Sequence, residues 1–357
     1  TTGEHNIAIG YQALDAEDAH GYNLAIGSFA LTTLDAGANG NNTAVGYNAG
    51  NAMTTGTANT LLGHGSGDAT DDGANNTAVG YLSLSANCGN DNVAVGYQAL
   101  MSSTGANNVA VGSGAGDAMT TTGRTVLVGN NAGTAINHAD AIGTIAIGHS
   151  AASTLTEGVG SIVIGYQAAE IMTTADYNTI IGFQAGGFGS VGLTTSGYNT
   201  AVGYQALGAS SADAITTDGY NTCIGFQSGY ELQNNGTFNT LIGVMSGFDM
   251  TTGDSNVAVG VNSLFNTTTG ESNIAMGRNA GDLITTGNSN TLIGHEADVD
   301  TNSDSYQVRL GHYGALRYMT AQITMSDFTS VNTDDAATDP LLKIPQYGFL
   351  KRVTCTV

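Results

Sequence analysis

A five-residue motif, Asn-Thr-Ala-Val-Gly in its commonest form, recurs eighteen times along the chain, usually at steps of 17 residues. A period this short, kept over some 300 residues, is typical of coils stacked on one another rather than of a globular domain around one core. The sequence therefore predicts an all-β fold, a parallel β-roll or β-solenoid of about 18 coils. The motif glycines are Gly10, Gly27, Gly46, Gly63, Gly80, Gly96, Gly112, Gly129, Gly148, Gly165, Gly182, Gly203, Gly225, Gly243, Gly260, Gly277, Gly294 and Gly311.

The residues before each motif glycine predict strands. Counted from that glycine, position −1 is always Val, Ile, Leu or Met, and position −3 is always Thr, Val, Ile or Leu. Position −2 is apolar in 17 of 18 coils, mostly alanine, with Arg309 as the exception. Such a run, bounded by Gly and Asn, is typical of strands, and a 17-residue coil is too short for a strand plus a crossover helix. We expect two short strands per coil with a bend at the glycine.

Two further recurrences predict how coils stack and close. Asparagine occupies position −4 in 14 of 18 coils, so stacked coils should align these amides in a ladder of side-chain hydrogen bonds. A Thr-Thr-Gly sequence recurs, for example at Gly56, Gly253 and Gly270, and we expect its glycine to adopt a positive φ in a tight reversal. Both prolines, Pro340 and Pro345, lie beyond the last coil, as expected where strand pairing needs every backbone N–H.

Both faces of the predicted strand are apolar, because side chains alternate across a strand. One coil can bury only its inward face, and an identical copy about a symmetry axis is the simplest cover for the other. We therefore predict a homotrimer with small residues inside the coil and aliphatic residues at the interface. The reverse orientation, a monomeric solenoid with a flat Ala/Thr face outward, stays open. The expected trimer interface at position −1 includes Val45, Val79, Val95, Ile181, Val202, Ile224 and Val259.

These repeats resemble two known families. Asn-Ile-Ala-Ile-Gly at 6–10 and Asn-Val-Ala-Val-Gly at 256–260 resemble the head repeat of trimeric autotransporter adhesins, a left-handed parallel β-roll assembled as a trimer. The longer form from Asn199 to Leu207 resembles the repeat of bacteriophage tail-fibre and appendage proteins. The resemblance covers residues 1 to about 311 and is specific for the architecture rather than for function. A 17-residue step exceeds the usual adhesin coil, and stalk heptads and a membrane anchor are not seen, which favours the phage fibre.

The resemblance implies a non-enzymatic structural fibre segment of a phage tail or virion appendage that positions host-receptor binding. Its implied partners are two further copies of the chain, other virion proteins and a host cell-surface receptor or glycan, and its implied location is the virion. The alternatives are a bacterial surface adhesin head that binds a host or matrix ligand, and a monomeric ice-binding solenoid. Nucleophile motifs, paired-carboxylate patterns and phosphate loops are not found in the sequence, so we expect neither catalytic residues nor a cofactor.

Composition argues against two classes of partner. The chain has 29 acidic residues against seven Lys and Arg, which gives a net charge of −22, and five of the seven basic residues lie in the last 49 positions. A rod without a basic stripe is not expected to bind nucleic acid, and no apolar stretch has the length for membrane insertion.

Cys88, Cys223 and Cys355 lie too far apart for a zinc motif, and Cys223 is expected in the core. Because residue 1 is Thr rather than Met, we expect the chain to be a piece of a longer protein.

The two longest steps predict a contact surface. Gly182 to Gly203 and Gly203 to Gly225 span 21 and 22 residues, so segments 186–198 and 208–220 should form neighbouring loops and one bulge. Aromatic and hydrogen-bonding groups there are compatible with a glycan or protein ligand, and a tolerated insertion without a ligand is the alternative. The candidate ligand-binding residues are Phe188, Tyr198, Ser210, Asp213, Asp218 and Tyr220.

Two histidines near the end of the repeats form a candidate metal site. His295 and His312 both follow a motif glycine one coil apart, so they should stack about 5 Å from each other. Neutral imidazoles bind transition metals if the rings point at a common centre, whereas outward-facing rings would only be solvated. The repeat pattern fails after Gly311, and we expect residues 312–357 to form a small β module that caps the shaft at 1–311 or links it to a further domain.

Overall fold

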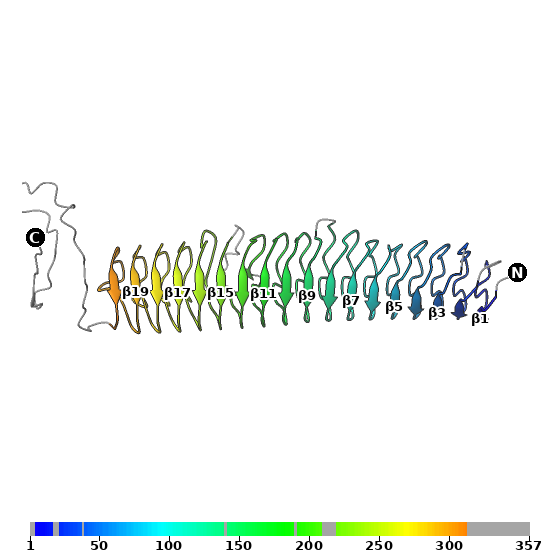
Figure 1. Ribbon diagram of the computed structural model, residues 1–357, viewed down its shortest axis with the longest axis horizontal. Helices are drawn as coiled ribbons and strands as arrows, with labels where there is room; N and C mark the ends of the chain where they lie inside the picture. The colour runs from blue at the N-terminus through cyan, green and yellow to red at the C-terminus, as the bar shows by residue number, and fades with distance from the viewer. Residues whose placement is uncertain are drawn as a thin grey trace, which may run out of the picture. The chain divides into compact units, whose positions relative to one another are not determined.

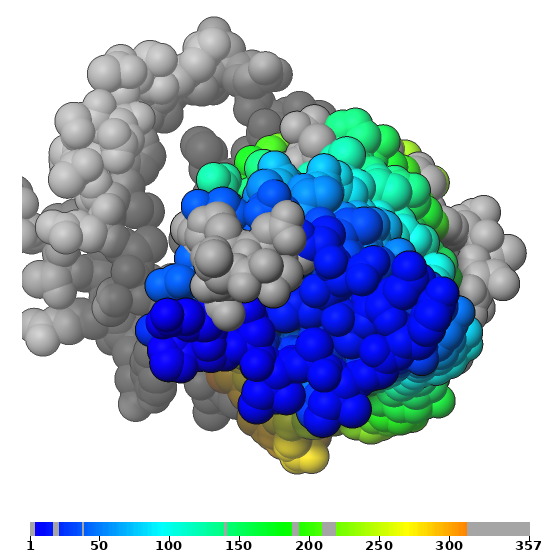
Figure 2. All heavy atoms as spheres, turned by 90° about the vertical axis from the view of Figure 1, so that its right-hand side faces the viewer, coloured from blue at the N-terminus to red at the C-terminus, as the bar shows by residue number. Residues whose placement is uncertain are grey.

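The computed structural model describes residues 4–16, 21–37, 39–138, 141–188, 191–208 and 219–312. These residues belong to one structural unit, Thr1–Ala315, which is an elongated stack of coils (Figure 1). Seen from the N-terminal end, the later coils lie behind the first ones (Figure 2). The predicted C-terminal module at 312–357 lies, except for His312, outside the described residues.

Each coil contributes one three-residue strand that ends directly before its motif glycine. The eighteen strands form one parallel sheet in which each strand pairs in register with the strand of the next coil, for example Ala201 with Cys223. An all-β parallel solenoid with a 17-residue repeat is thereby confirmed. The strands are β1 (Ile7–Ile9), β2 (Leu24–Ile26), β3 (Thr43–Val45), β4 (Thr60–Leu62), β5 (Thr77–Val79), β6 (Val93–Val95), β7 (Val109–Val111), β8 (Val126–Val128), β9 (Ile145–Ile147), β10 (Ile162–Ile164), β11 (Thr179–Ile181), β14 (Thr200–Val202), β15 (Thr222–Ile224), β16 (Thr240–Ile242), β17 (Val257–Val259), β18 (Ile274–Met276), β19 (Thr291–Ile293) and β20 (Val308–Leu310).

The expectation of a second strand after each glycine is wrong for the described coils apart from the first long one, which contains β12 (Gly187–Phe188) and β13 (Val191–Gly192). The residues that follow the glycine form turns, because positions +2 and +4 adopt positive φ in the coils from Gly10 to Gly277, as at Gln205 (φ 49°) and Leu207 (φ 54°). These turns still bond the coils together. The N–H of Gln205 donates to the carbonyl of Phe183 in the preceding coil, and the N–H of Leu207 donates to the carbonyl of Ser228 in the next, both at 2.9 Å.

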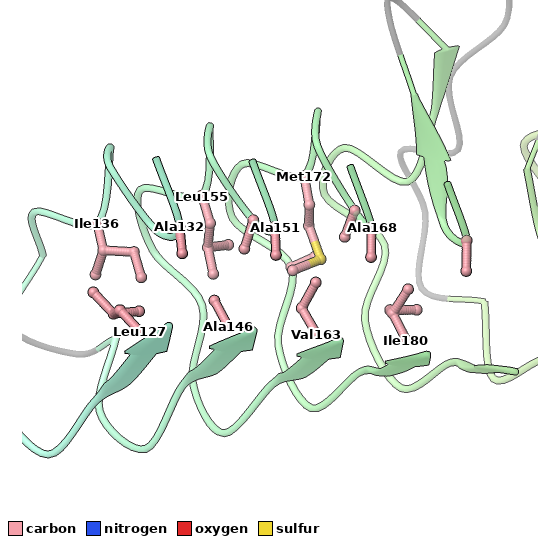
Figure 3. Packing of buried hydrophobic residues seen from close by; sticks show 14 of the residues in the cluster. Leu127, Ala132, Ile136, Ala146, Ala151, Leu155, Val163, Ala168, Met172 and Ile180 are labelled. Atoms are coloured by element: carbon pink, nitrogen blue, oxygen red, sulfur yellow. The ribbon is translucent and has the colours of Figure 1, made fainter. Parts of the chain in front are cut away.

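The core is a row of small and aliphatic side chains enclosed by each coil. The strand residue at position −2 points inward and meets the residues at +3 and +7 from the opposite side, as Leu127, Ala132 and Ile136 do (Figure 3). Ala146, with Ala151 and Leu155 opposite, repeats this arrangement one coil later. The strand therefore turns its small residues inward, as the trimer hypothesis assumed. The alternative with aliphatic residues inside and an outward Ala/Thr face is wrong, because alanine and threonine lie on opposite faces of the strand.

The motif glycine is required by both conformation and space. Its φ lies between 130° and 145° from Gly10 to Gly294, a region that L side chains rarely adopt. Glycine is required in the Thr-Thr-Gly sequences for a different reason. Gly56, Gly253 and Gly270 are not among the positive-φ residues, which corrects the expectation of a left-handed turn. An added Cβ at Gly253 would instead lie 2.7 Å from the carbonyl oxygen of Gly270 in the next coil, so close stacking excludes a side chain there.

The predicted asparagine ladder is confirmed. The Oδ1 of Asn256 accepts hydrogen bonds from the backbone N–H of Asn273 at 2.9 Å and from its Nδ2 at 3.2 Å. The Nδ2 of Asn256 in turn donates to Asn239 Oδ1 at 3.1 Å and to the carbonyl of Gly270 at 2.8 Å. These asparagines are buried, so each amide satisfies backbone groups that water cannot reach. The ladder joins successive coils inside the solenoid.

Replacing Asn256 with alanine is expected to lower the free energy of unfolding by about 2–4 kcal/mol. The substitution removes the acceptor of a buried backbone N–H, that of Asn273, and the donor to the Gly270 carbonyl. Asn266→Ala is the matched control, because Asn266 donates to the Asp282 carbonyl at an exposed position where water replaces it. Urea unfolding of both variants measures the difference. Equal losses would contradict a structural role of the ladder.

Candidate functional site

The outward strand face, defined here as positions −3 and −1, is an uncharged surface that runs along all eighteen strands. Its residues are Thr, Val, Ile, Leu or Met in all eighteen strands, without one charged side chain. The structure places every predicted interface residue on this face, half-buried by its neighbours or exposed, as Ile224 is at 37 %. The predicted set is Val45, Val79, Val95, Ile181, Val202, Ile224 and Val259.

Aromatic columns run along the stack at the two ends of these strands. At position +1, Tyr166, Phe183, Tyr204 and Phe226 stack with ring centroids 5.0–5.3 Å apart. At position −5, a second column stacks at 4.9–5.4 Å and contains Tyr177, Tyr198, Tyr220 and Phe238. Parallel strands in register place identical positions one strand spacing apart, which is the distance that offset ring stacking favours. The columns therefore stabilise the stack and leave ring edges in solvent.

The structure brings together only part of the predicted ligand surface. Tyr198 and Tyr220 lie next to each other, but they belong to the −5 column and continue into Tyr177 and Phe238, which come from coils without the long insertions. In the first long coil the backbone forms an antiparallel pair, β12 (Gly187–Phe188) with β13 (Val191–Gly192). Ser210, Asp213 and Asp218 lie outside the described residues. Tyr198 and Tyr220 thus belong to an aromatic column that extends beyond the two long coils.

The predicted histidine pair is accompanied by a carboxylate and a guanidinium. The rings of His295 and His312 are tilted, with centroids 5.7 Å apart. Glu296 lies between them, with Oε2 2.6 Å from His312 Nε2 and Oε1 3.4 Å from His295 Nε2. Arg278 Nη2 contacts His295 Nε2 and lies 4.0 Å from Glu296 Oε1. All four side chains are partly exposed, so they remain accessible from solvent.

A buried carboxyl lies beside this cluster. Asp298 occupies position +4, where the other described coils carry Leu, Gly or Ala, and it is only 4 % exposed. Its Oδ2 accepts the N–H of Leu283 at 2.9 Å and its Oδ1 that of Val299 at 2.8 Å. Burial, and then the hydrogen bond with the Asp282 side chain, raises the pKa of Asp298 to about 7. Asp282, Asp298 and Glu296 line an open hollow of about 280 Å³.

The Asp298 carboxyl makes the stability of this end of the solenoid depend on pH. Because its pKa rises from 3.8 to about 7 on folding, the folded chain retains a proton between these values that the unfolded chain releases. The contribution of Asp298 to stability should therefore be largest below pH 4 and should fall as pH rises towards 7. Asp282→Asn should reduce this fall and stabilise the region at pH 8 by about 1 kcal/mol, since an amide can donate to the ionised Asp298.

Hydrogen-exchange protection factors for the amides of Leu283 and Val299, compared at pH 5 and pH 8, measure this effect. Asp72→Asn is the control, because Asp72 is exposed and lies in a distant coil. Protection that changes equally with pH in the wild-type chain and Asp282→Asn would contradict the coupling between the two carboxyls.

The two described cysteines are core residues. Cys88 and Cys223 are free and buried, and burial raises the pKa of both thiols. Cys223 takes the inward −2 position of β15, as expected from its place in the motif. Arg309 takes the same inward position in β20, where its Nη2 lies 2.5 Å from Asp300 Oδ2. A guanidinium with a carboxylate partner therefore replaces the apolar residue in the last described coil.

Sequence comparisons do not assign the chain to a family. A scan against protein-family models finds no match, and a search of curated proteins finds no significant relative. Within the residues that the structure describes, no helix is long and apolar enough to cross a membrane.

Proposed function

We propose that the chain is a structural, non-enzymatic fibre segment that assembles as a homotrimer through the outward strand face. The uncharged composition of that face in all eighteen strands supports this proposal, since the chain carries 29 acidic residues elsewhere. Parallel sheets with two apolar faces occur almost only where both faces are covered. The inward face is covered by the coil itself, and a symmetric assembly of identical chains would cover the outward one.

The proposed role is that of a spacer in a phage tail fibre or related virion appendage, where it positions a receptor-binding part. Eighteen strands at about 4.8 Å give a rod of roughly 85 Å. Hydrogen bonds between successive coils run through both the strands and the turns, so the rod should resist bending. Other virion proteins at its ends and a host receptor or glycan are the proposed partners.

The mass in solution tests this proposal most directly. Sedimentation equilibrium of the unaltered segment should give three times the chain mass of 36.0 kDa, and small-angle scattering should give a rod of the length above. A stable monomer at micromolar concentration would refute the trimeric fibre and leave the outward face without its proposed cover.

A bacterial surface adhesin head is the second candidate, because half-exposed aromatic rings border the strands in the two columns. Tyr166 is 45 % exposed and Tyr177 is 52 % exposed, and such rings can contact sugars. Binding of the purified segment to a panel of host glycans would favour this candidate. A spacer is expected to bind none of them.

A further inference from the structure

We propose that His295, Glu296 and His312 bind one divalent transition-metal ion, with Zn²⁺ as the expected occupant. The three side chains offer two imidazole nitrogens and one carboxylate oxygen, all within 4.8 Å of one another. Imidazole suits Zn²⁺, Cu²⁺ and Ni²⁺, whereas Mg²⁺ and Ca²⁺ prefer sites made of oxygen. This inference concerns residues of a single chain, so it is independent of the proposed trimer.

The repeat itself brings these ligands together. Position +1 of successive coils stacks one strand spacing apart, and 295 and 312 are consecutive members of that column. Glu296 occupies position +2 of the coil at Gly294, the same coil that contributes His295. Its φ of 54° belongs to the turn conformation of this position. His149 provides a contrast, because it occupies the same column but stacks on Tyr166 at 5.1 Å. Two histidines in consecutive coils and an intervening carboxylate distinguish the proposed site.

The distances fit a metal after small movements of exposed side chains. In a tetrahedral site with bonds of about 2.0–2.1 Å, neighbouring ligand atoms lie roughly 3.3 Å apart. His295 Nε2 and Glu296 Oε1 are already 3.4 Å apart. His312 Nε2 lies 2.6 Å from Glu296 Oε2 in a direct hydrogen bond, which the metal would replace. The protein supplies three ligands, so a water molecule or another donor would complete the coordination.

The position of Arg278 indicates that His295 and Glu296 attract a cation. Its guanidinium contacts His295 Nε2 and faces Glu296 Oε1. A guanidinium has no lone pair, so in this contact Arg278 donates and His295 Nε2 accepts through the same lone pair that a metal would use. Arg278 is therefore a competitor rather than a ligand. Replacing Arg278 should therefore tighten metal binding. If the two histidines were surface residues without a metal site, the replacement would have no such effect.

The test is titration of the chelator-treated protein with Zn²⁺ and with Co²⁺. Calorimetry should show one Zn²⁺ per chain, and Co²⁺ should give the visible absorption of a site with nitrogen ligands. His295→Ala, His312→Ala and Glu296→Gln should each weaken binding at least about tenfold. Arg278→Gln should strengthen it several-fold. His149→Ala is the control and should leave the affinity unchanged, while circular dichroism verifies that every variant stays folded.

Three results would overturn the site. The first is the absence of Zn²⁺ binding at millimolar concentration. The second is equal loss of affinity in His149→Ala and His295→Ala, which would indicate nonspecific binding to imidazoles. The third is one ion for every three chains. This stoichiometry would mean that ligands from different chains bind the ion on a symmetry axis, and that Glu296 and the two histidines of one chain do not form the site.

Discussion

Replacing Gly203 with alanine is expected to disrupt the middle of the solenoid and to lower the free energy of unfolding by at least about 3 kcal/mol. The φ of Gly203 is 140°, and a Cβ there would lie 2.3 Å from the carbonyl oxygen of Gly225 and 2.7 Å from its carbonyl carbon. Both contacts are with backbone, so no side chain can rotate away. Relief would require separating two coils, which would break the strand pairing between β14 and β15.

Thermal unfolding and hydrogen exchange of the coils on either side measure this effect. Because each coil contacts only its neighbours, a central break should divide one cooperative transition into two. Gly37→Asn is the matched control, since Gly37 also has positive φ (63°) but has no atom within 4 Å of an added Cβ. Asparagine tolerates this conformation. A loss in Gly203→Ala no larger than that in the control would show that the coils can separate without cost.

The sequence was sufficient to predict the repeat, the strand positions and the ladder at position −4. Stacking in register converts each position of the motif into a column, so a residue that recurs at −4, such as Asn256, must meet its copies at 239 and 273. The sequence left two orientations of the strand open, and only the structure shows that the residues at position −2 point inward. The turn after the glycine was not. Side chains such as Gln205 and Leu207 carry no signal for positive φ, which the hydrogen bonds to neighbouring coils impose.

The candidate sites were predictable only where they followed a column. The pair of histidines was visible as consecutive members of position +1, but Glu296 was missed because its convergence with them depends on the turn conformation. Asp298 was also missed, although an acidic residue at the buried +4 position was a usable signal. The stacking of Tyr198 on Tyr220 was missed because the unequal steps hid their common position −5.

A charged residue at position 224 is expected to prevent assembly without unfolding the chain. Ile224 lies on the outward strand face and is 37 % exposed in the single chain, so a longer charged side chain can remain solvated there before assembly. In the proposed trimer, three copies would meet near one axis, where like charges are neither solvated nor paired. Ile224→Glu should therefore yield monomers with an unchanged far-ultraviolet circular dichroism spectrum, as measured by sedimentation.

Two further variants separate burial from long-range repulsion. The chain has a net charge of −22, so an added glutamate alone could weaken assembly through general repulsion. Ile224→Lys lowers the negative charge and should still yield monomers if position 224 is buried between chains. Val202→Thr on the neighbouring strand keeps the size and shape that the outward face already accepts at position −3, and should assemble normally. Trimers in Ile224→Lys would show that the outward strand face is not the interface.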